Sequence, residues 1–237
     1  MTHESGEGTA PAAVPRHLPT NTRRTWVYGM AQGLLRLLAI SLFRLRTHGV
    51  KNIPRHGGVL IVSNHQSYLD PAVLGVKVKR PMSFMAKSEL FVNKFFRGMI
   101  ESVNAFPVRQ GDGDIGAVRE TINRLQEGHV LVMFPEGGRT MNGEIEKMEG
   151  GMGLIIRRAG PTVRVVPAAI YGAYQAWPRQ SKLPHPAPIR VKYGAAMDLS
   201  SKRAAEIVKI LDAEIHRLFE ELRAEVKQAR RLGYSAG

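Results

Sequence analysis

The chain of 237 residues has ordinary apolar and charged fractions, 43% and 23%, but its formal net charge is +14. This length suits one large domain or two small ones with a substantial core. The sequence contains no cysteine, which excludes disulfides, thiolate nucleophiles and cysteine-based zinc sites. The excess of Lys and Arg predicts an anionic partner, which on charge alone is nucleic acid, an anionic membrane surface or a phosphorylated substrate.

The N-terminal part of the chain divides into two stretches. Residues 1–22 are rich in Pro, Ala, Thr and Gly and lack an apolar period, so we predict a disordered tail without a cleavable signal peptide. Residues 23–46 are leucine-rich, open on Trp26 and Tyr28, and have arginines at both ends. We interpret them as an amphipathic helix lying in the membrane interface. An ordinary core helix is the alternative, and Arg36 near the middle disfavours a true span.

From residue 47 the sequence alternates between strand-like and helix-like segments. We predict a single α/β domain over residues 47–231, with a mostly parallel mixed sheet flanked by helices. No internal repeat and no second domain boundary is visible. The predicted strands cover residues 59–62, 82–86, 103–108, 129–134, 163–171 and 189–193, and the predicted helices cover residues 71–78, 89–101, 114–126, 151–158 and 200–231.

A histidine and an aspartate bracket the loop after the first buried strand. His65 stands where that strand ends, and Asp70-Pro71 stands where the next helix begins. The four residues between them can fold back, so that Asp70 accepts a hydrogen bond from one imidazole nitrogen and leaves the other free to take a proton. This spacing predicts an oriented general base. A plain loop histidine beside a helix-capping Asp70 is the alternative.

Two further strand ends carry polar side chains. Arg109 follows the strand 103–108, and the run Phe134-Pro135-Glu136-Gly137-Gly138-Arg139 follows the strand 129–134. Functional sites in parallel α/β sheets gather at the carboxyl ends of strands. We therefore expect a base, a cation and a Glu/Arg pair to converge on one edge of the sheet.

These segments, in this order, resemble the glycerolipid acyltransferase family, specifically the bacterial 1-acyl-sn-glycerol-3-phosphate acyltransferases. The resemblance covers residues 45–195. Residues 64–70 look like the first family block, His-x4-Asp, and residues 134–140 look like the third, Phe-Pro-Glu-Gly-Thr-Arg-Ser. The second and fourth blocks resemble residues 86–91 with 105–109, and residues 166–170. Three positions depart from the pattern, namely Gly138, Thr140 and Glu149, the last of which stands where the family often has Lys.

The resemblance implies a glycerol-3-phosphate acyltransferase-like fold and an acyl transfer without cofactor or metal. The acyl group would pass from coenzyme A or acyl carrier protein to the sn-2 hydroxyl of lysophosphatidic acid, giving phosphatidic acid. His65 would be the general base and Asp70 its orienter. The enzyme would act at the cytoplasmic face of the cell membrane, as a peripheral or monotopic protein.

The resemblance also suggests which residues bind the acceptor. Lys87, Arg109 and Arg139 are the candidates for its phosphate, since Arg forks onto phosphate oxygens. Glu136 would orient Arg139 or the glycerol hydroxyl, with a loop-capping carboxylate as the alternative. Gly137 would let the backbone approach a ligand closely, although glycines in loops often serve only a turn.

Three rival functions remain to be weighed. A member of the same family with another acceptor, such as a lyso-ornithine lipid, fits the same motifs, and Glu149 favours caution about the headgroup. A nucleic-acid binder is suggested only by charge, and the basic residues are scattered without a recognisable binding motif. A serine hydrolase would need a Gly-x-Ser-x-Gly elbow, which the sequence lacks. We therefore expect lipid and thioester substrates and no nucleic-acid partner.

Overall fold

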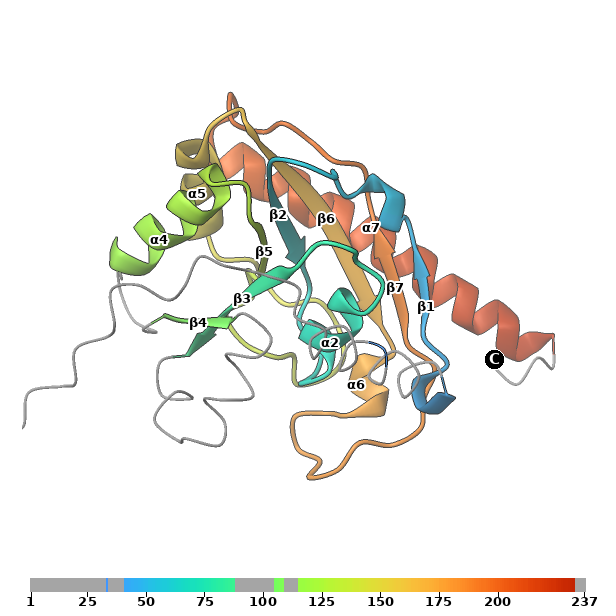
Figure 1. Ribbon diagram of the computed structural model, residues 1–237. Helices are drawn as coiled ribbons and strands as arrows, with labels where there is room; N and C mark the ends of the chain where they lie inside the picture. The colour runs from blue at the N-terminus through green and yellow to red at the C-terminus, as the bar shows by residue number, and fades with distance from the viewer. Residues whose placement is uncertain (1–32, 34–40, 88–104, 109–114, 233–237) are drawn as a thin grey trace, which may run out of the picture.

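One seven-stranded sheet forms the centre of the molecule, with the strand order β1-β7-β6-β2-β5-β3-β4 (Figure 1). The computed structural model describes residues 33, 41–87, 105–108 and 115–232. The predicted tail, most of the predicted N-terminal helix, the predicted helix 89–101 and Arg109 lie outside the described residues.

Six neighbouring strand pairs make up the sheet, and five of them are parallel. Only β6 and β7 run antiparallel. This confirms the predicted mostly parallel mixed sheet. The strands are β1 (Arg46–His48), β2 (Gly58–Ser63), β3 (Met82–Lys87), β4 (Ala105–Val108), β5 (Val130–Met133), β6 (Val163–Tyr171) and β7 (Arg190–Tyr193).

Helices cover both faces of the sheet (Figure 1). Apolar side chains of α4, α5 and α7 pack on one face, and those of α2 and α6 pack on the other. Within the described ranges, every helix is too short or too polar to cross a bilayer. The elements are α2 (Asp70–Gly75), α4 (Ile115–Gln126), α5 (Gly151–Ala159), α6 (Ala173–Ala176) and α7 (Ala204–Arg231), with a 3-10 turn η1 (Val50–Asn52).

Strand β2 is buried along its whole length. Val59 and Ile61 contribute to the core beneath α2, whereas Leu60 and Val62 contribute to the core beneath α5 and α7. A strand covered on both faces reads as a continuous apolar run rather than an alternating one. The sequence has such a run here, and it places β2 at the centre of the sheet, next to β5 and β6.

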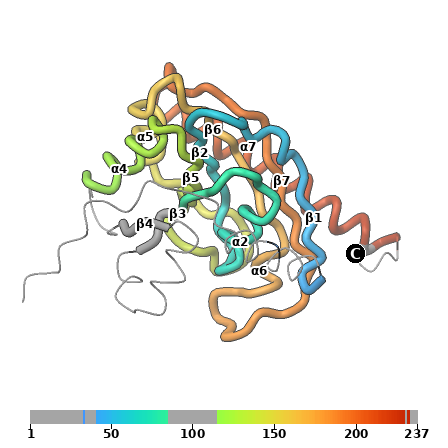
Figure 2. Tube along the Cα trace, viewed as in Figure 1, coloured from blue at the N-terminus to red at the C-terminus, as the bar shows by residue number. Residues whose placement is uncertain are grey.

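The predicted end of the N-terminal helix at residue 46 is wrong. The described part of that helix ends at Phe43, Arg44 takes a positive φ of 44°, and Arg46 begins strand β1. Figure 2 shows β1 running beside β7, although the two strands lie far apart in the sequence. The three residues of this edge strand are extended because they pair with β7. The periodicity of three residues cannot indicate such a pairing.

Two smaller differences concern the C-terminal half. The segment 174–188, predicted as loop, begins with the last three residues of the helix α6, which at four residues is too short to show a helical period. The long final helix begins at Ala204 rather than at residue 200.

The buried Arg190 of β7 holds two other parts of the chain. Its Nε donates to Glu225 Oε1 of α7 at 3.1 Å, and its Nη1 donates to the carbonyl of Arg44 at 2.9 Å.

Candidate active site

The first and third sequence blocks leave the sheet side by side. Val62 near the end of β2 is paired with Met133 at the end of β5. The residues that follow each strand, His65 and Phe134 among them, therefore emerge at the same carboxyl edge. In Figure 1 this edge lies at the bottom, beside α2 and α6.

The loop after β2 brings His65 and Asp70 together, as their spacing predicts. Imidazole Nδ1 of His65 lies 2.7 Å from Oδ2 of Asp70. A carboxylate oxygen can only accept, so this contact places a hydrogen on Nδ1 and leaves the lone pair on Nε2. The His65 side chain is 19% exposed, whereas that of Asp70 is fully buried. The contact through Nδ1 therefore fixes the orientation of the imidazole ring.

Asp70 shapes the loop rather than capping the helix that follows it. Its Oδ2 also accepts the backbone N–H groups of Gln66, at 2.5 Å, and Ser67, at 2.8 Å. The N-cap of α2 is Leu69, and no side chain caps that helix end. The helix-capping alternative for Asp70 is therefore wrong, because its carboxylate turns back into its own loop. Its other oxygen, Oδ1, is buried without a hydrogen-bond partner among the described residues.

The third block holds His65 from two sides. The Phe134 ring stacks on the imidazole, with 4.1 Å between centroids and an interplanar angle of 15°. The backbone N–H of His65 donates to Glu136 Oε1 at 2.9 Å, and its carbonyl accepts the N–H of Thr140, also at 2.9 Å. Sequence reasoning missed these contacts, because they join a ring and a carboxylate to a residue of another strand's loop.

Glu136 is the loop-capping carboxylate of the two alternatives. Its second oxygen, Oε2, accepts the backbone N–H of Glu146 at 3.1 Å, so both oxygens bind backbone rather than Arg139. Burial raises the pKa of Glu136 to about 8, and the two backbone N–H groups oppose that shift. Glu136 thus ties the histidine loop to the loop that follows β5.

Three buried polar side chains fix the path of the histidine loop. The Asn64 amide pairs with Ile170 on β6, accepting its N–H at 2.8 Å and donating to its carbonyl at 2.9 Å. Gln66 Nε2 donates to the carbonyl of Gly143 at 2.6 Å, and Ser67 Oγ donates to the carbonyl of Trp177 at 2.8 Å. In the sequence, the run of polar residues that directly follows the buried strand β2 could have indicated these roles.

Arg139 lies over an aromatic ring near the histidine loop. Its guanidinium carbon is 3.4 Å from the centroid of the Tyr68 ring, a cation–π arrangement. Nη1 of Arg139 is buried and has no hydrogen-bond partner among the residues that the structure describes. Tyr68 in turn lies 5.3 Å, between centroids, from the tilted ring of Trp177. A buried donor that has no acceptor costs free energy, so this nitrogen is suited to donate a hydrogen bond to an anionic ligand.

Of the two other predicted cations, the structure places Lys87, and that one by its backbone alone. Lys87 is the last residue of β3, and it pairs with Val108, the last residue of β4. Because β3 neighbours β5 in the sheet, both strand ends lie on the carboxyl edge that carries the third block. The side chain of Lys87 and all of Arg109 lie outside the described residues.

Gly137 occupies a left-handed turn. Its φ is +69°, a conformation that favours glycine, and a Cβ at this position would lie 2.7 Å from Oε1 of Glu149. The left-handed turn and the neighbouring carboxylate both favour glycine at this position.

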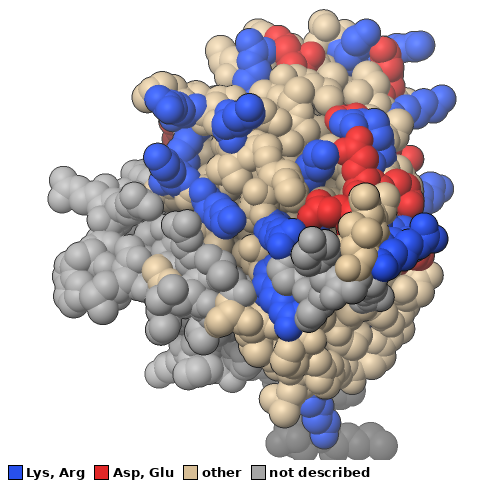
Figure 3. Space-filling model, turned by 90° about the vertical axis from the view of Figure 1, so that its right-hand side faces the viewer, with Lys and Arg blue, Asp and Glu red and all other residues tan. Residues whose placement is uncertain are grey.

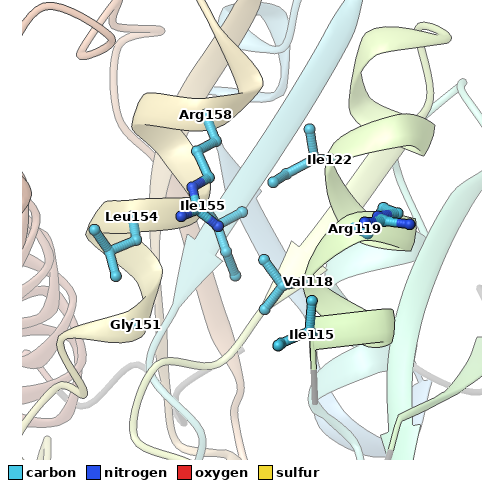
Figure 4. A pocket seen from close by; sticks show the side chains of 8 residues that line it. All are labelled: Ile115, Val118, Arg119, Ile122, Gly151, Leu154, Ile155 and Arg158. Carbon is cyan, nitrogen blue, oxygen red and sulfur yellow. The ribbon is translucent and has the colours of Figure 1, made fainter. Parts of the chain in front are cut away.

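An apolar groove of about 290 Å³ lies between α4 and α5 (Figure 4). None of the predicted site residues lines it. Its lining residues are Ile115, Val118, Arg119, Ile122, Gly151, Leu154, Ile155 and Arg158.

Comparison with known proteins finds acyltransferases that are similar to this chain. The family model described as Acyltransferase matches residues 44–171. A 1-acyl-sn-glycerol-3-phosphate acyltransferase of Bacillus subtilis is 29% identical over 129 residues, which is 54% of this chain and 63% of the relative. One of Streptococcus pneumoniae is also 29% identical, over 85% of this chain and 75% of the relative.

Two further comparisons concern the acceptor and the fold. A lyso-ornithine lipid O-acyltransferase of Pseudomonas aeruginosa is 30% identical over 58% of this chain and 51% of the relative. The crystal structure of the 1-acyl-sn-glycerophosphate (LPA) acyltransferase from Thermotoga maritima superposes with a TM-score of 0.68 at 24% identity, over 86% of this chain and 85% of that one. The likeness to the Thermotoga structure shows that the two chains share a fold.

Proposed function

Because the chain belongs to the acyltransferase family, we propose that it transfers a fatty acyl group from a thioester to the sn-2 hydroxyl of lysophosphatidic acid, giving phosphatidic acid. The observation that carries the proposal is the 2.7 Å contact between His65 and Asp70 at the carboxyl edge of the sheet. The names of the Bacillus and Streptococcus relatives support lysophosphatidic acid as the acceptor.

In the proposed reaction His65 is the general base. Its Nε2 takes the proton of the acceptor hydroxyl while that oxygen attacks the thioester carbonyl carbon. Asp70 stabilises the imidazolium that forms. The tetrahedral intermediate then collapses, the carbon–sulfur bond breaks, and the imidazolium returns the proton to the leaving thiolate. The acceptor hydroxyl is itself the nucleophile, so a chain without cysteine can perform this chemistry.

Arg139 is the proposed anchor for the phosphate of the acceptor. Its buried Nη1 lacks a partner among the described residues, and its guanidinium is held on the Tyr68 ring. A guanidinium offers phosphate two parallel donors in a fixed plane. Lys87 and Arg109 are further candidates, because their strands end at the same edge. Glu136 and Gly137 stay candidates for contact with the acceptor, and both also shape the loop that carries Arg139.

The donor and the place of action complete the proposal. The acyl group comes from coenzyme A or acyl carrier protein, without a cofactor. The net charge of +14 favours a cytoplasmic membrane surface that carries anionic lipid, because each nearby Lys or Arg contributes about 1 kcal/mol there.

A second acceptor is favoured by one observation in addition to the Pseudomonas relative. The Glu149 carboxylate lies beside the turn at Gly137, and Gly137 precedes Arg139 by two residues. A carboxylate suits a cationic headgroup such as that of a lyso-ornithine lipid.

The experiment that decides between the two acceptors supplies the enzyme with a radiolabelled acyl thioester and each lysolipid in turn. Selective use of lysophosphatidic acid, lost in His65→Ala, is expected. Selective use of lyso-ornithine lipid would overturn the acceptor, and full activity of His65→Ala would overturn the mechanism.

A further inference from the structure

Exposed apolar side chains gather around the mouth of the site. Tyr68 of the histidine loop is 56% exposed, Met141 of the loop after β5 is 53% exposed, and Leu183 of the segment 177–188 is 71% exposed. These side chains come from three separate parts of the chain. We call them, together with the exposed cations Arg179 and Lys182, the mouth surface.

Contacts join the three segments of the chain that form the mouth surface. The Tyr68 ring packs against Trp177, with 5.3 Å between centroids. The hydroxyl of Tyr174 donates to the carbonyl of Met141 at 2.8 Å, and Nη1 of Arg179 lies 3.8 Å from Met141 Sδ. These contacts join the segment that carries Leu183 and Lys182 to Tyr68 and Met141, and Arg139 lies on the same Tyr68 ring.

The part of the mouth surface formed by residues 173–188 is positively charged, whereas Met141 donates its backbone N–H to Glu146 Oε1 at 3.2 Å. The segment 173–188 contains Arg179, Lys182 and His185 but no Asp or Glu, and all three basic side chains are exposed. In Figure 1 this segment projects at the bottom of the molecule, beyond α6. Figure 3, which keeps the same vertical direction, shows acidic side chains in the upper part of the visible face and none at its lower end.

The segment holds Leu183 outward through its own hydrogen bonds. The backbone N–H of His185 donates to the carbonyl of Ala176 at 2.6 Å, and Trp177 Nε1 donates to the carbonyl of Ser181 at 3.1 Å. Ser181 Oγ donates to the carbonyl of Leu183 at 2.8 Å. A preformed loop loses little further conformational entropy when it binds a partner.

We propose that the mouth surface contacts an anionic lipid bilayer, with Leu183 inserted among the acyl chains and Arg179 and Lys182 at the level of the headgroups. The segment 173–188 has an exposed apolar tip at Leu183, flanking cations and no acidic residue, which matches the interface of such a bilayer. The contact would let a lysolipid keep its acyl chain in the bilayer while its headgroup reaches Arg139 and His65. Only this last consequence rests on the proposed function.

The test uses the absence of native cysteine. Leu183→Cys in the full chain is labelled with an environment-sensitive fluorophore and mixed with vesicles of phosphatidylglycerol and phosphatidylcholine. Leu154→Cys on α5 is the matched control, since Leu154 is also exposed, at 50%. A blue shift and quenching by nitroxide-bearing lipids are expected for the label at position 183, and neither for the label at position 154.

A second measurement examines the cations. Replacing Arg179 and Lys182 together by Ala should weaken vesicle binding about 25-fold at low salt, because about 1 kcal/mol per cation equals about fivefold each. Replacing Arg203 and Lys209, both exposed near the start of α7, should change binding less than twofold. Transfer to a water-soluble short-chain acceptor should be unchanged in Leu183→Glu.

The outcomes separate this inference from the proposed reaction. A depth signal at position 183 without transfer to lysophosphatidic acid would sustain the membrane contact and overturn the reaction. Flotation with vesicles but no signal at position 183 would overturn the contact, as would failure to bind vesicles at all. A signal raised by an acidic acyl carrier protein in place of vesicles would assign the mouth surface to the donor and also overturn the proposal.

Discussion

The guanidinium carbon of Arg139 lies 3.4 Å from the centroid of the Tyr68 ring, so a residue of the third sequence block rests on a residue of the first. The ring restricts the guanidinium to one orientation while Nη1 stays without a hydrogen-bond partner among the described residues. The contact therefore links the proposed phosphate anchor to the loop that carries His65. It also makes the anchor sensitive to the aromatic character of position 68.

Tyr68→Leu is expected to raise KM for lysophosphatidic acid about 3- to 30-fold, with a smaller change in kcat. A cation–π contact of this kind contributes about 0.5–2 kcal/mol, and its loss frees Arg139 to leave the phosphate. Tyr68→Phe keeps the ring and should stay within about twofold of the wild type. Steady-state kinetics with varied acceptor measures both. Equal losses in the two variants would show that the ring is not the platform.

Asp70→Asn is expected to lower kcat roughly 10²–10⁴-fold while the fold persists. Asparagine can place its oxygen where Oδ2 accepts three N–H groups and its amide where Oδ1 has no partner among the described residues. The loop geometry is thereby retained, but the negative charge that stabilises the imidazolium is lost. Single-turnover transfer and thermal melting should be compared. A large drop in melting temperature together with the lost activity would point to a structural role for Asp70.

Glu136 should make stability depend on pH. Its pKa rises on folding from 4.5 to about 8, chiefly through burial. The folded protein then holds a proton that the unfolded chain has lost, so stability falls as the pH rises from about 4.5 to about 8. Below about pH 4.5 Glu136 is protonated in the folded and in the unfolded protein, so the full stability is present and no longer changes with pH through this group.

Glu136→Gln removes this titration and serves as the comparison. The melting temperature of the wild type relative to Glu136→Gln should decrease from pH 5 to pH 8, by roughly 2–4 °C for each kcal/mol involved. Thermal melts in one buffer series at constant ionic strength measure this difference. A difference that stays constant across the window would show that Glu136 is already ionised at pH 5.

Arg190→Met is expected to destabilise the protein by about 1–3 kcal/mol, because it leaves the Glu225 carboxylate and the Arg44 carbonyl without their buried donor. Lys192→Met is the matched control on the same strand. Lys192 also pairs with a glutamate of α7, Glu221, but both side chains are partly exposed, at 35% and 40%. Such a pair contributes about 0–1 kcal/mol. Urea unfolding of both variants gives the comparison, and similar losses would contradict it.

Local sequence patterns predicted most of the sheet and the central pair of the site. The apolar run of β2 indicated a strand buried on both faces, and the predicted span of β6 agrees with the structure. The spacing of five positions from His65 to Asp70 was short enough for loop geometry to follow from sequence. The edge strand β1 escaped prediction because its pairing partner, β7, lies about 140 residues further along the chain.

Sequence by itself therefore determined the class of fold, the histidine–aspartate loop and the order of the blocks, because these depend on periodicity and on contacts within a few residues. Tertiary structure decided how the blocks meet. Glu136 binds the backbone of His65 across 71 residues, Phe134 stacks on its ring, and Tyr68 supports Arg139. These contacts exist because β2 and β5 are neighbours in the sheet. That adjacency results from long-range packing of the strands, which no local pattern of residues encodes.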